Sequence, residues 1–123
     1  MPGANLVVIA DDDGDIRLLV ERRLSRRGWD VVAAADGPEA LELVRARHPA
    51  AVVLDSTMPG MTGEEVVAAM RADAGTRDIP AILLSAHEGA ADPADARLLK
   101  PFDIETLDAA LHRLVEDRGS ASG

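Results

Sequence analysis

Short apolar runs alternate along this chain with longer amphipathic stretches, and this alternation restricts the possible folds more than any other feature. Short apolar runs that end at polar or turn-forming residues favour buried strands. The longer stretches repeat their apolar residues with helical spacing. Strand, helix and strand in this order predict parallel βαβ units, and hence a doubly wound α/β sheet of order 2-1-3-4-5. The predicted strands are residues 6–10, 31–35, 51–55, 80–85 and 98–99.

Each predicted helix carries a recognisable start or stop signal. Gly28 ends the first helix, as a C-terminal cap would, and Pro38 lies in the first turn of the second. Thr62 and Glu65 have the spacing of a capping box at the start of the third. Asp103 can cap the last helix.

Composition excludes several classes of function. The chain has 123 residues, enough for one domain with one real core, and 47% of them are hydrophobic. Its 13 basic and 22 acidic residues give a net charge of −9, which argues against direct DNA binding and against anionic membrane surfaces. No cysteine is present, and neither a signal peptide nor a membrane span is visible. We therefore expect a cytoplasmic protein without membrane insertion.

Carboxylates follow the ends of two predicted strands. Asp55 ends the third strand, and Asp11, Asp12 and Asp13 follow the first. Ligands of open sheets bind outside the strand ends where the strand order reverses, and these two strands flank that point. Aspartates at strand ends are also common caps and turn formers, a role that we assign to Asp13. Carboxylates this close repel one another unless a cation neutralises them, so Asp11, Asp12 and Asp55 indicate a site for Mg²⁺ or Mn²⁺.

The residues around this edge suggest phosphoryl chemistry. An aspartate carboxylate can attack a phosphoryl group and form an acyl phosphate, which is the role that we assign to Asp55. Ser85 ends the fourth strand and Lys100 follows the fifth, so a hydroxyl and an ammonium reach the same edge. Either residue alone is an ordinary strand-end side chain, but the combination is far more specific. We expect a cis peptide bond before Pro101, which would fix the direction of the lysine.

Over about residues 6–116 the chain resembles a response-regulator receiver domain of two-component signalling. The resemblance implies a flavodoxin-like fold and magnesium-dependent phosphorylation of Asp55 by a histidine kinase or a histidine phosphotransfer protein. We expect a single receiver domain over residues 1–123, with a flexible tail over 119–123. The motifs that carry the resemblance are Asp11-Asp12-Asp13, the stretch from Leu54 to Gly63, Ser85-Ala86 and Lys100-Pro101-Phe102.

The resemblance also implies individual roles. By position, Asp12 is the main metal-binding acid beside Asp11, and the backbone carbonyl of Thr57 is the third protein ligand. Ser85 matches the switch hydroxyl, and Lys100 matches the phosphate-binding lysine. Positions that control donor access and phosphate lifetime correspond to Thr57, Ala86 and His87, although His87 is also an ordinary loop histidine.

Two features depart from the family. Receivers usually carry tyrosine or phenylalanine three residues before the lysine, where this chain has Arg97. A guanidinium cannot be buried as a ring is without leaving an unpaired charge, so we do not expect the usual aromatic coupling; pairing of Arg97 with an acid is the alternative, and its stem can still pack. Ser85 and Lys100 are 15 positions apart, fewer than the family usually has. Because residues 87–96 contain a proline and no Leu, Ile or Val, we predict that the helix usually found there is absent or reduced to about one turn.

The leading hypothesis is a phospho-accepting module that signals by protein contact with a kinase or phosphotransfer protein and with a further target. We expect no turnover of an external substrate. The alternative is a receiver-like binding module that works without phosphorylation, which the change at Arg97 and the lost helix motivate and the retained chemistry disfavours. A phosphatase of external substrates would need a second aspartate two residues after the nucleophile, where Thr57 stands.

Overall fold

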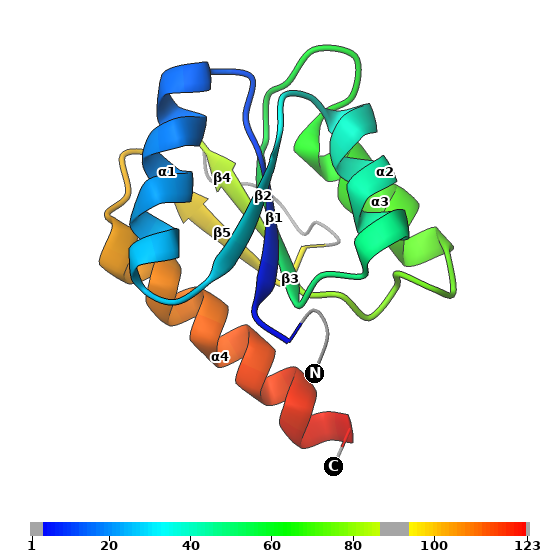
Figure 1. Ribbon diagram of the computed structural model, residues 1–123. Coiled ribbons are helices and arrows are strands. Elements are labelled where there is room, and N and C mark those ends of the chain that lie inside the picture. The colour runs from blue at the N-terminus through cyan, green and yellow to red at the C-terminus, as the bar shows by residue number, and fades with distance from the viewer. Residues whose placement is uncertain (1–3, 87–93, 123) are drawn as a thin grey trace.

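The computed structural model describes residues 4–86 and 94–122, with side chains described as far as residue 116 (Figure 1). Five parallel strands form one sheet in the order β2-β1-β3-β4-β5, which confirms the predicted topology. The strands are β1 (Leu6–Ala10), β2 (Asp30–Ala34), β3 (Ala51–Asp55), β4 (Ala81–Ser85) and β5 (Ala96–Leu99). The helices are α1 (Gly14–Arg26), α2 (Gly37–Arg47), α3 (Gly63–Ala72) and α4 (Ile104–Ser122).

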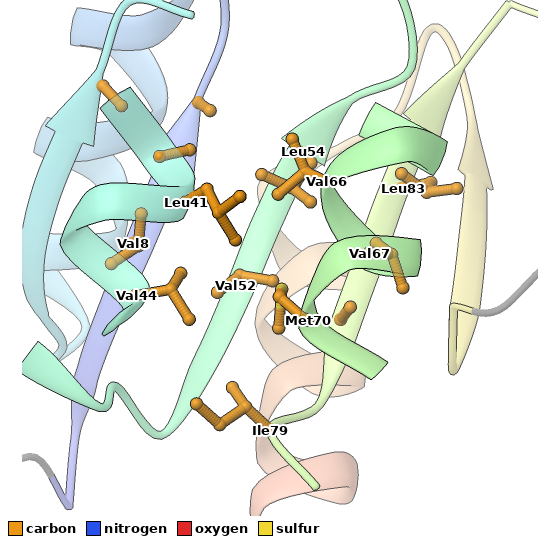
Figure 2. Close-up of a cluster of buried hydrophobic side chains, with 14 of the residues drawn as sticks. Val8, Leu41, Val44, Val52, Leu54, Val66, Val67, Met70, Ile79 and Leu83 are labelled. Atoms are coloured by element: carbon orange, nitrogen blue, oxygen red, sulfur yellow. The ribbon is translucent and has the colours of Figure 1, made fainter. Parts of the chain in front are cut away.

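Helices cover both faces of the sheet, because β1, β3 and β4 are apolar on both sides. Helices α2 and α3 lie on one face, and α1 and α4 lie on the other (Figure 1). Figure 2 shows the first of these layers, where Leu41 and Val44 of α2 and Met70 of α3 lie over Val52 of the central strand β3. Burial on both sides is the expected condition of a parallel sheet. The two cores fix the strands, and with them the loops at the strand ends.

Local side-chain contacts start the helices where the sequence predicts. Asp13 caps α1, accepting hydrogen bonds from the N–H groups of Asp15 at 3.0 Å and Ile16 at 3.3 Å. Thr62 and Glu65 form the predicted capping box of α3. These contacts satisfy backbone donors that the first turn of a helix cannot satisfy itself. They also set where the loops after β1 and β3 end.

The observed β2 and β4 differ from the predicted strands by one residue at their ends, and larger differences occur at β5 and α4. β5 begins at Ala96 instead of Leu98, because Ala96 and Arg97 pair with Ile82 and Leu83 of β4. Helix α4 continues to Ser122 and so includes most of residues 119–123, for which we expect a flexible tail. One glycine costs an established helix only about 1 kcal/mol, and Gly119 therefore need not stop it. The helix predicted to be absent or shortened before β5 would fall mainly on 87–93, which are outside the described residues.

None of the helices in the described part of the chain has the length and apolar character needed to cross a membrane.

Candidate functional site

Three carboxylates meet at the carboxyl ends of β1 and β3. One oxygen each of Asp11, Asp12 and Asp55 lies within 4.8 Å of the others. Asp11 and Asp55 are only 4% and 5% exposed, whereas Asp12 faces solvent. Because Ala10 is paired with Leu54 across the two strands, the residues that follow each strand are brought together at one edge. The structure thus brings together the acids that the sequence selected.

The surroundings of the Asp11 carboxylate favour a positive charge beside it. Its Oδ1 accepts a hydrogen bond from the N–H of Asp13 at 2.9 Å, but its buried Oδ2 has no hydrogen-bond partner. The pKa of Asp11 is raised to about 6, mainly by burial and also by the neighbouring Asp55, while the Asp13 N–H and Lys100 act to lower it. Oxygen ligands of this kind are those that Mg²⁺ and Mn²⁺ prefer. The three acids therefore fit a divalent cation.

Lys100 brings a positive charge to the acidic cluster. Its Nζ donates a hydrogen bond to Asp55 Oδ1 at 3.0 Å. The backbone N–H of Lys100 donates to the carbonyl of Ser85 at 2.7 Å, and the Lys100–Pro101 peptide bond is cis. A single ammonium beside three carboxylates leaves an excess of negative charge. A bound cation together with Lys100 would supply positive charge to a phosphoryl group at this site.

The other selected residues lie around the same edge. Ser85 is buried at the end of β4, and the exposed Ala86 follows it. Thr57 is exposed, and its N–H donates to Asp55 Oδ1 at 3.3 Å. His87 is outside the described residues. Asp55 is paired with Leu84 in the sheet, which places Ser85 next to the end of β3.

Arg97 pairs with an acid, as its position requires. Its Nη2 lies 3.2 Å from Oε2 of Glu64, which belongs to the first turn of α3. The Glu64 carboxylate also accepts a hydrogen bond from the hydroxyl of Ser56 at 2.9 Å. Through this hydrogen bond the charged pair is linked to Ser56, the residue that directly follows Asp55.

Three residues near the site were missed from the sequence. Glu64 has the ordinary place of an acid in a first helical turn, and nothing local shows that it faces Ser56 and Arg97. Arg17 of α1 donates from Nη1 to the carbonyl of Asp11, which precedes the helix, at 2.8 Å. Gly63 lies against the backbone of Asp55. The one signal for Glu64 was Arg97, which stands where receivers usually carry an aromatic ring and for which an acidic partner was the alternative.

Comparison with known proteins decides the family. The response regulator receiver domain matches residues 7–112 of the chain. The chain belongs to this family. As a receiver domain it is a phosphoryl-acceptor module of two-component signalling, a class that interacts with histidine kinases and binds Mg²⁺ in an acidic site.

Similar proteins include both curated relatives and solved structures. Transcriptional regulatory protein PrrA of Mycobacterium tuberculosis is 38% identical, and the match covers 94% of this chain and 52% of PrrA. The probable transcriptional regulator ycf27 of Porphyridium aerugineum is 36% identical, with 94% of this chain and 50% of that protein covered. Response regulator protein TrrA from Thermotoga maritima, in complex with Mg²⁺ and BeF, aligns with a TM-score of 0.82 and 30% identity over 89% of this chain and 98% of that chain. The chain thus spans about half the length of the curated relatives it matches.

Proposed function

We propose that Asp55 accepts a phosphoryl group from a phosphohistidine of a histidine kinase or of a histidine phosphotransfer protein. The observation that carries the proposal is the contact between Lys100 Nζ and Asp55 Oδ1 inside a cluster of three carboxylates. An Asp55 oxygen attacks phosphorus and forms a P–O bond. The P–N bond of the donor breaks, and its electron pair stays on the leaving imidazole.

The other residues of the site would orient the group and balance its charge. Asp11, Asp12 and the Thr57 carbonyl would hold Mg²⁺ or Mn²⁺, which supplies positive charge to the phosphoryl oxygens when bound. Lys100 would exchange its bond to Asp55 for one to a phosphoryl oxygen, and the Ser85 hydroxyl would donate to another. Such preorganised donors favour the charge that develops during transfer.

We infer that the module signals by protein contact in the cytoplasm. The curated relatives are named as transcriptional regulators, and an output of that kind is consistent with this chain. A net charge of −9 disfavours direct contact of these 123 residues with DNA. Thr57 stands where a phosphatase would need a second acid, so we expect no turnover of an external phosphate ester.

Labelling with acetyl phosphate and Mg²⁺ tests the proposal. Intact-mass measurement should show one added phosphoryl group on the wild-type chain and none on Asp55→Asn. The control variant Asp15→Asn removes a carboxylate from the first turn of α1 outside the cluster and should still be labelled. If the wild-type chain gains no mass, or Asp55→Asn gains as much, Asp55 is not the acceptor.

A further inference from the structure

Glu64, the second residue of α3, connects segments that are far apart in the sequence. Both of its carboxylate oxygens lie 2.9 Å from the Oγ atom of Ser56, and Oε2 accepts a hydrogen bond from Arg97 Nη2 at 3.2 Å. Ser56 directly follows Asp55, and Arg97 lies on the edge strand β5. A continuous polar chain, Ser56–Glu64–Arg97, therefore runs from the residue after the acceptor to the edge of the sheet.

The first turn of α3 also lies directly against the backbone of Asp55. A Cβ atom on Gly63 would lie only 2.5 Å from the Asp55 carbonyl oxygen, so the approach requires glycine. The N–H of Gly63 donates to the Ser56 carbonyl at 3.1 Å, and the N–H of Ser56 donates to the carbonyl of Leu84 at 2.9 Å. The backbone after Asp55 is thus held by β4 on one side and by α3 on the other.

The ion pair between Glu64 and Arg97 is partly buried, so each charge requires a polar or charged partner close to it. The Arg97 side chain is 16% exposed, and a guanidinium this far from water is costly without an acid. Partial burial opposes ionisation of Glu64, but hydrogen bonds from its own N–H, from Ser56 and from Arg97 outweigh it and hold the pKa of that carboxyl below its usual value. Glu64 is therefore ionised at neutral pH, where it can orient the Ser56 hydroxyl and pair with Arg97.

We propose that Glu64 is a positioning residue for the acceptor: held by Arg97, it fixes Ser56 and so the orientation of the adjoining Asp55. The inference rests on the proposed function in taking Asp55 as the acceptor. Phosphoryl transfer needs the attacking oxygen in line with the leaving group, so a small displacement of Asp55 slows the reaction strongly. Arg97 then holds, through Glu64, the acceptor loop, which we define as residues 56–62 between β3 and α3. It does so from the strand position where receivers usually carry an aromatic ring.

A second ion pair, between α3 and the residue just before β5, provides a matched comparison. Arg71 of α3 and Asp95, which immediately precedes β5, are 2.7 Å apart. Asp95 also accepts a hydrogen bond from the N–H of Ala81 at the start of β4. This pair lies toward the far end of α3 from Ser56. If the Glu64 pair served only to attach β5 to α3, loss of charge in either pair would have the same effect.

The test compares Glu64→Gln with Asp95→Asn, since each replaces one carboxylate of an ion pair by an amide of similar shape. The measurement is the rate constant for labelling by acetyl phosphate in Mg²⁺. We expect Glu64→Gln to slow labelling about fivefold or more. Asp95→Asn should stay within about twofold of wild type. Equal effects of the two variants, or a wild-type rate in Glu64→Gln, would overturn the proposal.

Variants of Ser56 and Arg97, the outer members of the polar series, show whether these two residues and Glu64 act as a unit. Ser56→Ala and Arg97→Met should each slow labelling, and either change combined with Glu64→Gln should slow it no further, because coupled residues are not additive. Arg97→Lys keeps the charge and should recover part of the rate. Effects that multiply in the double variants would contradict the proposal. Ser56→Ala removes only a hydroxyl and still provides the test if Arg97→Met fails to fold.

Hydrogen exchange gives a readout that needs no phosphorylation. The Ser56 amide should exchange about fivefold faster in Glu64→Gln than in Asp95→Asn, because only the first variant loosens the acceptor loop. If the wild-type chain cannot be labelled but this difference appears, the proposed function fails while the positioning by Glu64 stands. If labelling succeeds and both variants exchange and react alike, the positioning role fails alone.

Discussion

Asp11 is buried with one carboxylate oxygen unpaired, beside the carboxylate of Asp55. In the absence of a divalent cation this arrangement opposes folding, because a carboxylate with one oxygen unpaired is removed from water. The raised pKa of Asp11 expresses the same cost. The carboxylates that would hold a cation therefore lower the stability of the cation-free protein.

We predict that Asp11→Asn stabilises the cation-free protein at pH 7.5 by about 1–3 kcal/mol. The asparagine Oδ1 can still accept from the Asp13 N–H, and a neutral amide replaces the unpaired oxygen. Urea denaturation in the presence of a chelator measures the difference. Asp15→Asn, an exposed charge change on α1, should leave the stability nearly unchanged.

The pH dependence of this difference has a defined sign. The folded-state pKa of about 6 lies above the ordinary 3.8, so the contribution of the Asp11 carboxyl to stability is fully present below pH 3.8 and lost as pH rises through about 6. The advantage of Asp11→Asn should therefore be small at pH 4 and grow up to about pH 7. An advantage that stays constant from pH 4 to 7 would show that Asp11 is not the cause.

The positions of the candidate site residues were predictable where a charged side chain follows a predicted strand. Asp11, Asp12, Asp55 and Lys100 were selected because strand ends converge at one edge, and the structure brings them together. Glu64 was not selected as part of the site, because its role depends on which way a first-turn side chain faces. In the structure the Glu64 side chain faces Ser56 and Arg97, and these contacts with other segments cannot be read from the local sequence.

At the scale of elements, the first residue of α3, Gly63, lies directly against the backbone of Asp55. A Cβ atom on Gly63 would lie 2.5 Å from the Asp55 carbonyl oxygen and 2.8 Å from Leu83 Cδ2, and both belong to well-packed strands. The capping box was predictable from the spacing of Thr62 and Glu65. The requirement for glycine between them was not, because it arises from a contact with a distant strand.

We predict that Gly63→Ala destabilises the fold by about 1–3 kcal/mol, because α3 must move away from β3. Gly14→Ala is the control, since its added Cβ would come no closer than 3.5 Å to the nearest side chain outside its neighbours. That variant should stay within about 0.5 kcal/mol of wild type. Thermal unfolding followed by circular dichroism measures both. Equal stability of the two variants would mean that α3 does not lie against Asp55.

For the whole molecule, the order of the strands follows from the alternation of strand and helix with right-handed crossovers. That topology alone brings the ends of β1 and β3 together. The boundaries of β5 and the length of α4 were less predictable, because pairing with β4 and propagation of an existing helix override weak local preferences. The site therefore depends on the complete fold, with contributions from β1, β3 and the segment after β5.

A cation that binds acids from separate strands binds only the folded chain, so Mg²⁺ should raise the unfolding midpoint. At ten times its dissociation constant the expected gain is about 1.4 kcal/mol, increasing with the logarithm of concentration. Thermal unfolding in MgCl₂, compared with NaCl of equal ionic strength, measures this gain. Asp12→Asn should lose most of it, and Asp15→Asn should keep it, since both remove one exposed carboxylate but only the first belongs to the cluster. If Asp12→Asn responds to Mg²⁺ as wild type does, the cation binds somewhere other than the edge formed by β1 and β3.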